Sequence, residues 1–156
     1  NNVIKVIPET EELGFVGVPS KIDNDIILNI IKEKKIPIIS PLGLKKDQAY
    51  NINGDIAAGA IAKSLKCRRL LLMTNVEGVL NREKKLISEI NSSKIIEMIE
   101  DKTITEGMIP KINTCLDAVK NDVTAVGIID GRKPRSVLFE LFSDKGSGTL
   151  IRKWKI

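Results

Sequence analysis

Residues 54–74, GDIAAGAIAKSLKCRRLLLMT, contain a helix pattern followed by a strand pattern, and this order decides the fold class. Residues 54–66 carry small side chains at helical spacing, which lets a helix backbone approach a sheet or a ligand closely. Residues 70–74 form a continuous apolar run, as in parallel strands that are covered on both faces. A helix followed by a buried strand is the repeating unit of α/β proteins.

The same alternation recurs along the rest of the chain. Apolar runs predict two more buried strands, at residues 36–40 (IPIIS) and 123–130 (VTAVGIID). Further helices are expected over residues 24–35, 92–100, 111–120 and 135–142. We expect Ser92 to be the N-cap of the helix that begins there. The predicted fold class is therefore α/β, with helices layered on an open, mainly parallel sheet.

The composition limits the chemistry that the chain can perform. Its 156 residues are 42% hydrophobic and 29% charged, as in one globular domain with a sizeable core. No apolar run approaches the roughly 20 residues that a membrane helix needs, and residues 1–8 show no secretory signal. We therefore expect a cytoplasmic protein without a membrane partner. The chain has no histidine, which excludes an imidazole base and a Ser-His-Asp triad within it.

Charge and cysteine content each have an ordinary and a functional interpretation. The net charge of +5 is typical of some nucleic-acid binders. However, the lysines are interleaved with acidic residues and only 3% of residues are aromatic, so we expect a solvated surface and no nucleic-acid partner. Cys67 and Cys115 are far apart and lack metal-ligand spacing, so we expect two reduced core thiols rather than a disulfide, and no metal site.

A first polar cluster, Tyr50–Asp55, lies at the start of the small-residue helix. Asn51 can offer both a donor and an acceptor to a ligand, and Asp55 lies where the helix dipole favours a carboxylate. The alternative is that Asn53 or Asp55 only caps the helix.

Two more clusters follow later in the chain. Residues 74–80 (TNVEGVL) lead from a strand end into a tight turn, where α/β sheets bind their ligands. In residues 107–111 (GMIPK), a glycine and a proline place Lys111 at a helix start, where its point charge suits a phosphate. The alternative for Lys111 is an ordinary exposed cation. The chain contains neither a Walker A pattern nor a GxGxxG pattern.

Taken in order, five segments resemble the acetylglutamate kinases of the amino acid kinase family: YNINGD, LLLMTNVEGVL, GMIPK, GIIDGR and FELFSDKGSGTLI. The likeness runs from about Leu13 to Ile151. It implies a three-layer αβα sandwich in which ATP, with Mg²⁺, phosphorylates the side-chain carboxylate of N-acetyl-L-glutamate during arginine synthesis. The family's glycine-rich phosphate loop, first catalytic lysine and substrate-gripping arginine have no match. Residues 1–156 are therefore expected to be the C-terminal, ATP-binding half of an amino acid kinase domain.

The resemblance also implies roles for single residues. Lys111 would stabilise the transition state, Asp55 would organise the lysines of phosphoryl transfer, and Asn51 would bind the substrate. The implied nucleotide contacts are Asn75, Val76, Glu77, Gly78, Val79, Leu80 and Met108. The chain departs from many relatives in having Asn75 in place of aspartate and Gly54 in place of alanine. A carboxylate nucleophile carries no proton at pH 7, so this chemistry does not require the missing histidine.

The pattern E-x-x-S-D-x-G-x-G-T, which begins at Glu140, resembles the arginine-inhibited members of the family. It implies a separate L-arginine site at Glu140, Gly146 and Gly148. The alternative is a helix end with an ordinary glycine cap. The same resemblance suggests a homo-oligomer, the PII signal protein as a partner, and the plastid stroma as the alternative compartment. Two other functions stay open: a sister amino acid kinase with another substrate, and a non-catalytic module that senses arginine or docks a protein.

Overall fold

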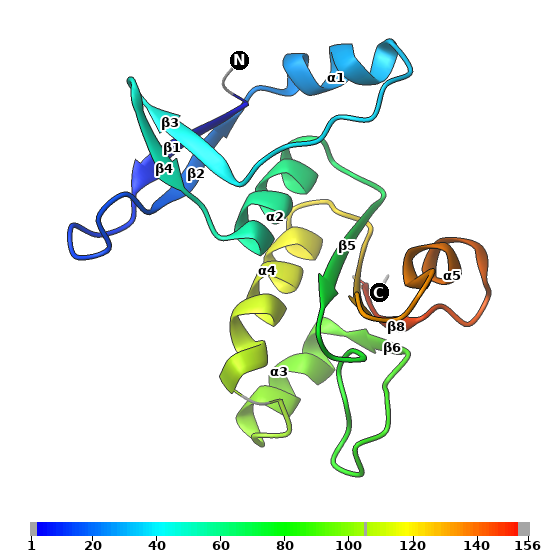
Figure 1. The fold of residues 1–156 in the computed structure, drawn as a ribbon. Coiled ribbons are helices and arrows are strands. Elements are labelled where there is room, and N and C mark those ends of the chain that lie inside the picture. The colour runs from blue at the N-terminus through cyan, green and yellow to red at the C-terminus, as the bar shows by residue number, and fades with distance from the viewer. Residues whose placement is uncertain (1–2, 105, 153–156) are drawn as a thin grey trace. The chain divides into compact units, whose positions relative to one another are not determined.

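The computed structural model describes residues 3–104 and 106–152, and the chain divides after Leu65 into two compact units. The first unit contains a four-stranded sheet of order β2-β1-β3-β4 (Figure 1). β1 pairs antiparallel with β2 and parallel with β3, and β3 forms a hairpin with β4. The strands are β1 (Ile4–Pro8), β2 (Gly17–Ile22), β3 (Leu42–Lys45) and β4 (Gln48–Asn51). The helices are α1 (Asn24–Lys32) and α2 (Gly54–Ser64).

Helix α2 has small side chains on the face that it buries. It buries Ala57, Gly59 and Ala62, and Ala57 joins a core cluster with Ile4 and Ile52. Its N-cap is Asn53, whose side-chain oxygen accepts hydrogen bonds from the backbone N–H groups of residues 55 and 56 at 2.9 and 3.3 Å. The capping alternative therefore holds for Asn53, and Asp55 lies in the first helical turn.

The strand predicted at residues 36–40 is wrong. These residues have no regular secondary structure, and Ile36 and Ile38 are 88% and 96% exposed. Within the described part of the chain no strand pairs with this segment. Pro37 and Pro41 also lack the N–H groups that a ladder requires.

The second unit has a four-stranded sheet of order β5-β7-β8-β6. β7 pairs parallel with β5 and antiparallel with β8, and β6 pairs parallel with β8. Its strands are β5 (Arg69–Thr74), β6 (Glu89–Asn91), β7 (Ala125–Asp130) and β8 (Gly148–Arg152). Its helices are α3 (Ser92–Glu100), the 3-10 helix η1 (Glu106–Met108), α4 (Ile109–Lys120) and α5 (Ser136–Phe142).

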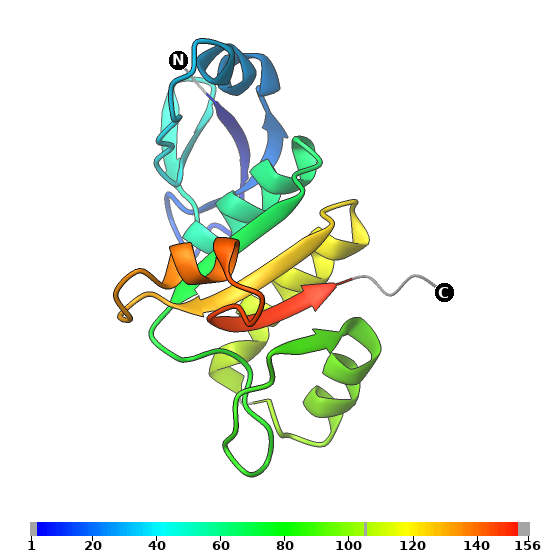
Figure 2. The same ribbon diagram turned by 90° about the vertical axis from the view of Figure 1, so that its right-hand side faces the viewer.

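This second sheet lies between two helix layers. Figures 1 and 2 show α5 on one face and α3 with α4 on the other, and all six residues of β7 are buried. The α/β class is thus confirmed, and both sheets are mixed because each contains antiparallel pairs.

Several local predictions need correction. The N-cap of α3 is Asn91, whose side chain accepts from the Lys94 N–H at 2.7 Å, so the assignment to Ser92 is wrong. Helix α4 begins two residues earlier than predicted, and α5 begins at Ser136 because Arg135 has a left-handed backbone with φ 62°. The short strands β1, β2, β3, β4, β6 and β8 were not predicted, because they lack the continuous apolar runs on which the predictions rested.

Two further predictions concern thiols and membrane helices. Cys67 and Cys115 are both free thiols, and burial raises the pKa of Cys67. Among the described residues, no helix has the length and apolar character needed to cross a bilayer.

Candidate functional site

The predicted substrate residues of the first unit lie at the turn between β4 and α2. Asn51 is the exposed last residue of β4, and its backbone N–H donates to the Phe15 carbonyl at 2.8 Å. Asp55 is partly exposed in the first turn of α2, where the helix dipole favours its charge. Because Asn53 already caps the helix, neither Asn51 nor Asp55 serves as its N-cap.

The predicted nucleotide loop begins where β5 ends, in the second unit. Gly78 has φ 145°, a conformation that side chains rarely adopt. A Cβ atom at this position would lie 2.6 Å from Thr149 Oγ1 and 2.7 Å from Leu86 Cδ1. Glycine is therefore required here both for the backbone turn and for the close approach of β8.

Five of the predicted nucleotide residues line one cavity of about 150 Å³. They are Val76, Gly78, Val79, Leu80 and Met108. Thr103 and Ile104 complete the lining and were missed, because no motif marks the segment that precedes η1. The volume suits a flat base rather than a whole drug-sized ligand, which typically needs about 300 Å³ or more.

Asn75 and Glu77 do not line this cavity. Both are exposed, and the Glu77 carboxylate accepts from Lys133 Nζ at 2.6 Å. The residue before Asn75 is also fixed to the turn that contains Lys133, because the Gly131 N–H donates a hydrogen bond to the Thr74 carbonyl at 2.8 Å. Contacts with the turn after β7 therefore fasten the first part of the loop.

Helix α4 begins directly after the cavity residue Met108. Lys111 lies in its first turn and is partly buried. Pro110 occupies the start of this helix, where its missing N–H costs no hydrogen bond. The N-terminus of a helix carries a partial positive charge, to which Lys111 adds a full one. The two charges together attract a nearby anion. The arrangement suits a lysine that binds phosphate.

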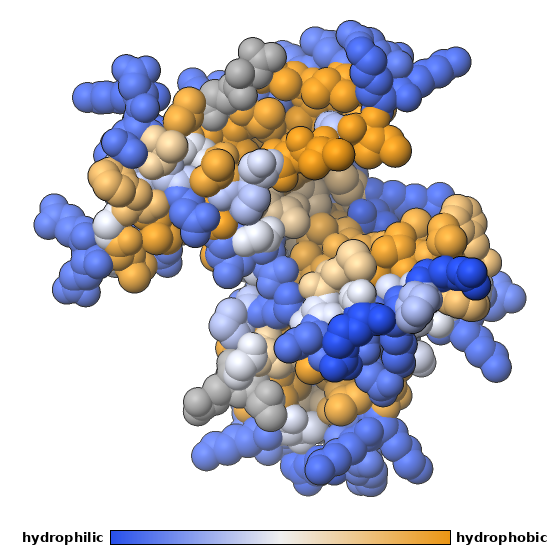
Figure 3. Space-filling model, viewed as in Figure 1, coloured by the Kyte–Doolittle hydropathy of each residue, from blue (hydrophilic) through white to orange (hydrophobic). Residues whose placement is uncertain are grey.

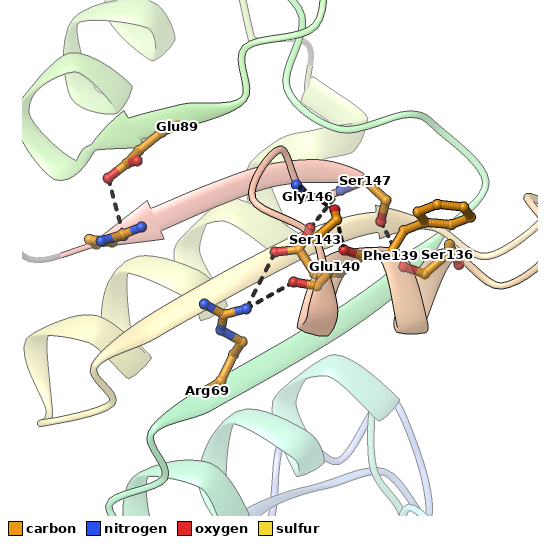
Figure 4. Close-up of polar contacts among 9 residues, drawn as sticks. Arg69, Glu89, Ser136, Phe139, Glu140, Ser143, Gly146 and Ser147 are labelled. Carbon is orange, nitrogen blue, oxygen red and sulfur yellow. Dashed lines mark hydrogen bonds and ion pairs between the residues drawn. The ribbon is translucent and has the colours of Figure 1, made fainter.

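A second cavity, of about 440 Å³, adjoins α5. Glu140 lies at its edge and is only 5% exposed, and its carboxylate accepts from the Ser147 N–H at 2.8 Å. Arg69 reaches across from β5: its Nη1 donates to the Glu140 carbonyl at 3.1 Å and lies 3.9 Å from Glu140 Oε1 (Figure 4). Gly127 on β7 lies next to this carboxylate: a Cβ there would touch Glu140 Oε1 at 3.4 Å, whereas it would come within 2.8 Å of Leu71 Cδ2.

Neither predicted glycine caps α5, because the helix ends at Phe142 and its C-cap is Ser143. The Ser143 hydroxyl donates to the Phe139 carbonyl at 2.6 Å and accepts from the Gly146 N–H at 3.2 Å. A Cβ on Gly146 would lie 2.8 Å from Glu140 Oε2, and one on Gly148 would collide with the Ile128 carbonyl. Both glycines therefore allow the segment after α5 to pass close to Glu140 and to β7.

The lining of the larger cavity carries both signs of charge. The cations are Arg69, Lys145 and Arg152, and the acids are Glu89, Glu140 and Asp144. Arg152 Nε lies 3.1 Å from Glu89 Oε1. Arg69, Glu89 and Arg152 were missed, because only the pairing of the strands brings these distant positions together. A cavity of this size and charge suits a small zwitterion.

Asp130 ends β7 and is 2% exposed. Two hydrogen bonds of 2.9 Å from the Arg132 guanidinium, together with one from the Arg132 N–H, hold the pKa of this carboxyl at about 2. The turn after β7 is thereby fixed at the sheet edge that carries the nucleotide loop.

The second unit has an α/β sheet with a cavity directly after the parallel strand β5, at the sheet edge where proteins of this class bind their ligands. Residues 2–130 match the model of the amino acid kinase family. The chain belongs to the amino acid kinase family.

Individual proteins show the same kinship. Acetylglutamate kinase from Pelagibacter ubique is 58% identical over 98% of this chain, which covers 54% of that protein. Among solved structures, N-acetylglutamate synthase from Neisseria gonorrhoeae shares the fold with a TM-score of 0.91 at 23% identity, over 99% of this chain and 37% of that one. Carbamate kinase from Giardia lamblia has a TM-score of 0.71 at 19% identity, over 97% of this chain and 59% of that one. The chain spans about half the length of the curated relatives that it matches.

Proposed function

We propose that this chain is the C-terminal, nucleotide-binding half of an acetylglutamate kinase. The whole enzyme would transfer the γ-phosphoryl group of ATP to the side-chain carboxylate of N-acetyl-L-glutamate. The observation that carries the proposal is the cavity after β5, which is lined by five residues chosen from the sequence as nucleotide contacts. The 58% identity to an acetylglutamate kinase supports the choice of substrate over that of a sister kinase.

The residues present suit phosphoryl transfer to a carboxylate. The attacking oxygen carries no proton at neutral pH, so the work of the protein is positioning and charge neutralisation. Lys111 would neutralise the charge that develops on the transferred group, Asp55 would orient the lysines, and Asn51 would hold the acetylated substrate. No cluster of three or more acidic or thiol ligands occurs in the described part of the chain, and we take Mg²⁺ to arrive with ATP as part of the co-substrate.

An exposed apolar surface on the first unit supports the proposal that the chain is one half of a larger protein. Residues 36–40 are an apolar segment in which Ile36 and Ile38 are exposed to solvent while Ile39 is half-buried against the core cluster, and Figure 3 shows hydrophobic side chains along it. Beside it, a groove of about 330 Å³ is lined by Ile38, Ile39 and residues of β3. A segment of this composition is typical of a buried strand. We propose that strands from the part of the relatives' length that this chain does not span cover it.

We also propose that L-arginine inhibits the whole enzyme through the cavity beside α5. The guanidinium of the ligand would bind the Glu140 carboxylate. The carboxylate of the ligand would bind to the cationic side chains that line the cavity. Arg69 already lies close to Glu140, so an incoming guanidinium has to displace it or share the carboxylate with it. The homo-oligomer and the PII partner stay predictions.

Calorimetry with the 156-residue chain tests the proposal. ATP with Mg²⁺ should bind, and Lys111→Gln should weaken its binding. A kinase assay of the complete polypeptide with N-acetyl-L-glutamate and with L-glutamate then tests the substrate: preference for unacetylated glutamate would favour a sister kinase. Binding of arginine without binding of nucleotide would favour the non-catalytic sensing module.

A further inference from the structure

Thr149, the last residue of the pattern that begins at Glu140, is a fully buried polar residue of β8, and neither the predicted sites nor the proposed chemistry assigns it a role. Its hydroxyl makes two hydrogen bonds. It accepts from the Val79 backbone N–H at 2.8 Å and donates to the Ile87 carbonyl at 2.7 Å. The O–H donor and one lone pair of this hydroxyl are thus bonded to backbone groups far away in the sequence.

The two partners of Thr149 lie on opposite limbs of the loop that follows β5. Val79 is on the outgoing limb and Ile87 on the returning limb, and the Ile87 N–H donates to the Val79 carbonyl at 2.9 Å. Leu80 and Leu86 form an antiparallel bridge beyond them. The Thr149 hydroxyl therefore bonds to both limbs at the point where the loop leaves the sheet.

The same limb carries the lining of the candidate nucleotide cavity. Gly78, Val79 and Leu80 line that cavity, whereas Thr149 does not. Gly78 also packs directly on the hydroxyl, because a Cβ on Gly78 would lie 2.6 Å from Oγ1. Any shift of Thr149 would move one wall of the cavity.

We propose that Thr149 is a positioning residue for the nucleotide cavity: its hydroxyl fixes Val79 and Ile87 so that residues 78–80 hold the shape that receives the base. This inference rests on the proposed function for its ligand, ATP, but not for the geometry of the loop. The buried hydroxyl stabilises the loop more than a solvent-exposed one would, because water cannot replace it as the partner of the Val79 N–H.

Three variants of the 156-residue chain test the inference. Thr149→Val keeps the shape of the side chain but leaves the Val79 N–H and the Ile87 carbonyl without their partner. Thr149→Ser keeps the hydroxyl. Ile151→Val is the matched control, since Ile151 is a fully buried neighbour on β8 whose side chain makes no hydrogen bond. Each is measured by amide hydrogen exchange and by calorimetry with ATP and Mg²⁺.

In Thr149→Val we expect the Val79 amide to exchange at least tenfold faster and the Kd for ATP to rise about tenfold, a change of about 1.4 kcal/mol. Thr149→Ser should stay within about threefold of the parent chain in both measurements. Ile151→Val should lower the midpoint of unfolding while leaving the Val79 amide and the Kd near their parent values.

The inference is overturned if Thr149→Val behaves like Ile151→Val, with reduced global stability but an unchanged Val79 amide and unchanged ATP binding. If the parent chain binds no ATP, the proposed function fails instead. The Val79 amide in Thr149→Val then still decides whether the hydroxyl fixes the loop.

Discussion

Two apolar runs of this chain have opposite fates: residues 36–40 (IPIIS) in the first unit and strand β7 (AVGIID) in the second. Both are typical of buried strands by sequence. Every residue of β7 is buried, whereas Ile38 is almost fully exposed. β7 has β5 and β8 as neighbours and helices on both faces, while the described residues supply no partner strand to residues 36–40.

An apolar run therefore indicates that a segment is suited to a buried strand. It does not show that the strands and helices needed to bury it are present in the same stretch of chain. All strands and helices that pack against β7 are part of this chain. Asp130 at the carboxyl end of β7 and Glu140 on α5, which covers it, are therefore held by hydrogen bonds. Residues 36–40 have no partner strand among the described residues, and the proposed cover for them belongs to the part of the relatives' length that this chain does not span.

The largest effect is expected from truncating the two runs themselves. Ile128→Ala on β7 should lower the free energy of unfolding by about 2–5 kcal/mol, because it opens a cavity in a fully buried site. Ile38→Ala should change it by less than about 0.5 kcal/mol, as exposed substitutions do. Urea unfolding followed by circular dichroism measures both. Equal losses in the two variants would mean that residues 36–40 are packed after all.

The second effect concerns Glu140, which lies over β7. Glu140→Gln keeps the volume and the acceptor for the Ser147 N–H but removes the charge. Losing a charge-assisted pair costs about 1.5–3 kcal/mol, so the Kd for L-arginine should rise at least tenfold. Calorimetry with arginine measures it, and Glu97→Gln, at an exposed position of α3, serves as the control. The arginine site is misplaced if both variants bind arginine as the parent does.

A smaller effect separates two asparagines of the first unit. Asn53→Ala removes the N-cap of α2 and should cost about 0.5–2 kcal/mol of stability. Asn51→Ala removes an exposed side chain and should leave stability within about 0.5 kcal/mol, since its role is predicted to be in substrate binding. Thermal unfolding of the two variants makes the comparison. A cost for Asn51→Ala as large as that for Asn53→Ala would give Asn51 a structural role.

The smallest effect is the acid sensitivity of the β7 end. Asp130 has a pKa of about 2 in the folded chain because Arg132 hydrogen-bonds to its ionised form, whereas an unfolded aspartate titrates near about 3.9. Its contribution to stability is therefore complete only above about pH 5 and is lost progressively as the pH falls through the two pKa values toward about 1. Asp130→Asn should show a shallower loss of stability across this window in urea unfolding. Parallel curves for parent and variant would refute the link.

Sequence patterns predicted the parts of the structure that depend on local chemistry. The helices follow from periodicity and the strands β5 and β7 from continuous apolar runs, which together give the α/β class, and the tight turn expected after β5 contains Gly78 with φ 145°. The short strands β6 and β8 depend on pairing with distant segments, and so do the contacts of Arg69 and Thr149. No window of sequence around either residue contains its partner, so only the fold could reveal these contacts.

The most direct test of the central claim, that the cavity after β5 binds a nucleotide, is a titration of the ¹⁵N-labelled chain with ATP and Mg²⁺ followed by NMR. The account predicts that the amide signals that shift most belong to the cavity lining, at Val76, Gly78, Val79, Leu80, Thr103, Ile104 and Met108. These shifts should be reduced in Lys111→Gln. Absence of any shift at saturating ATP, or shifts confined to Glu140 and the segment after α5, would contradict it.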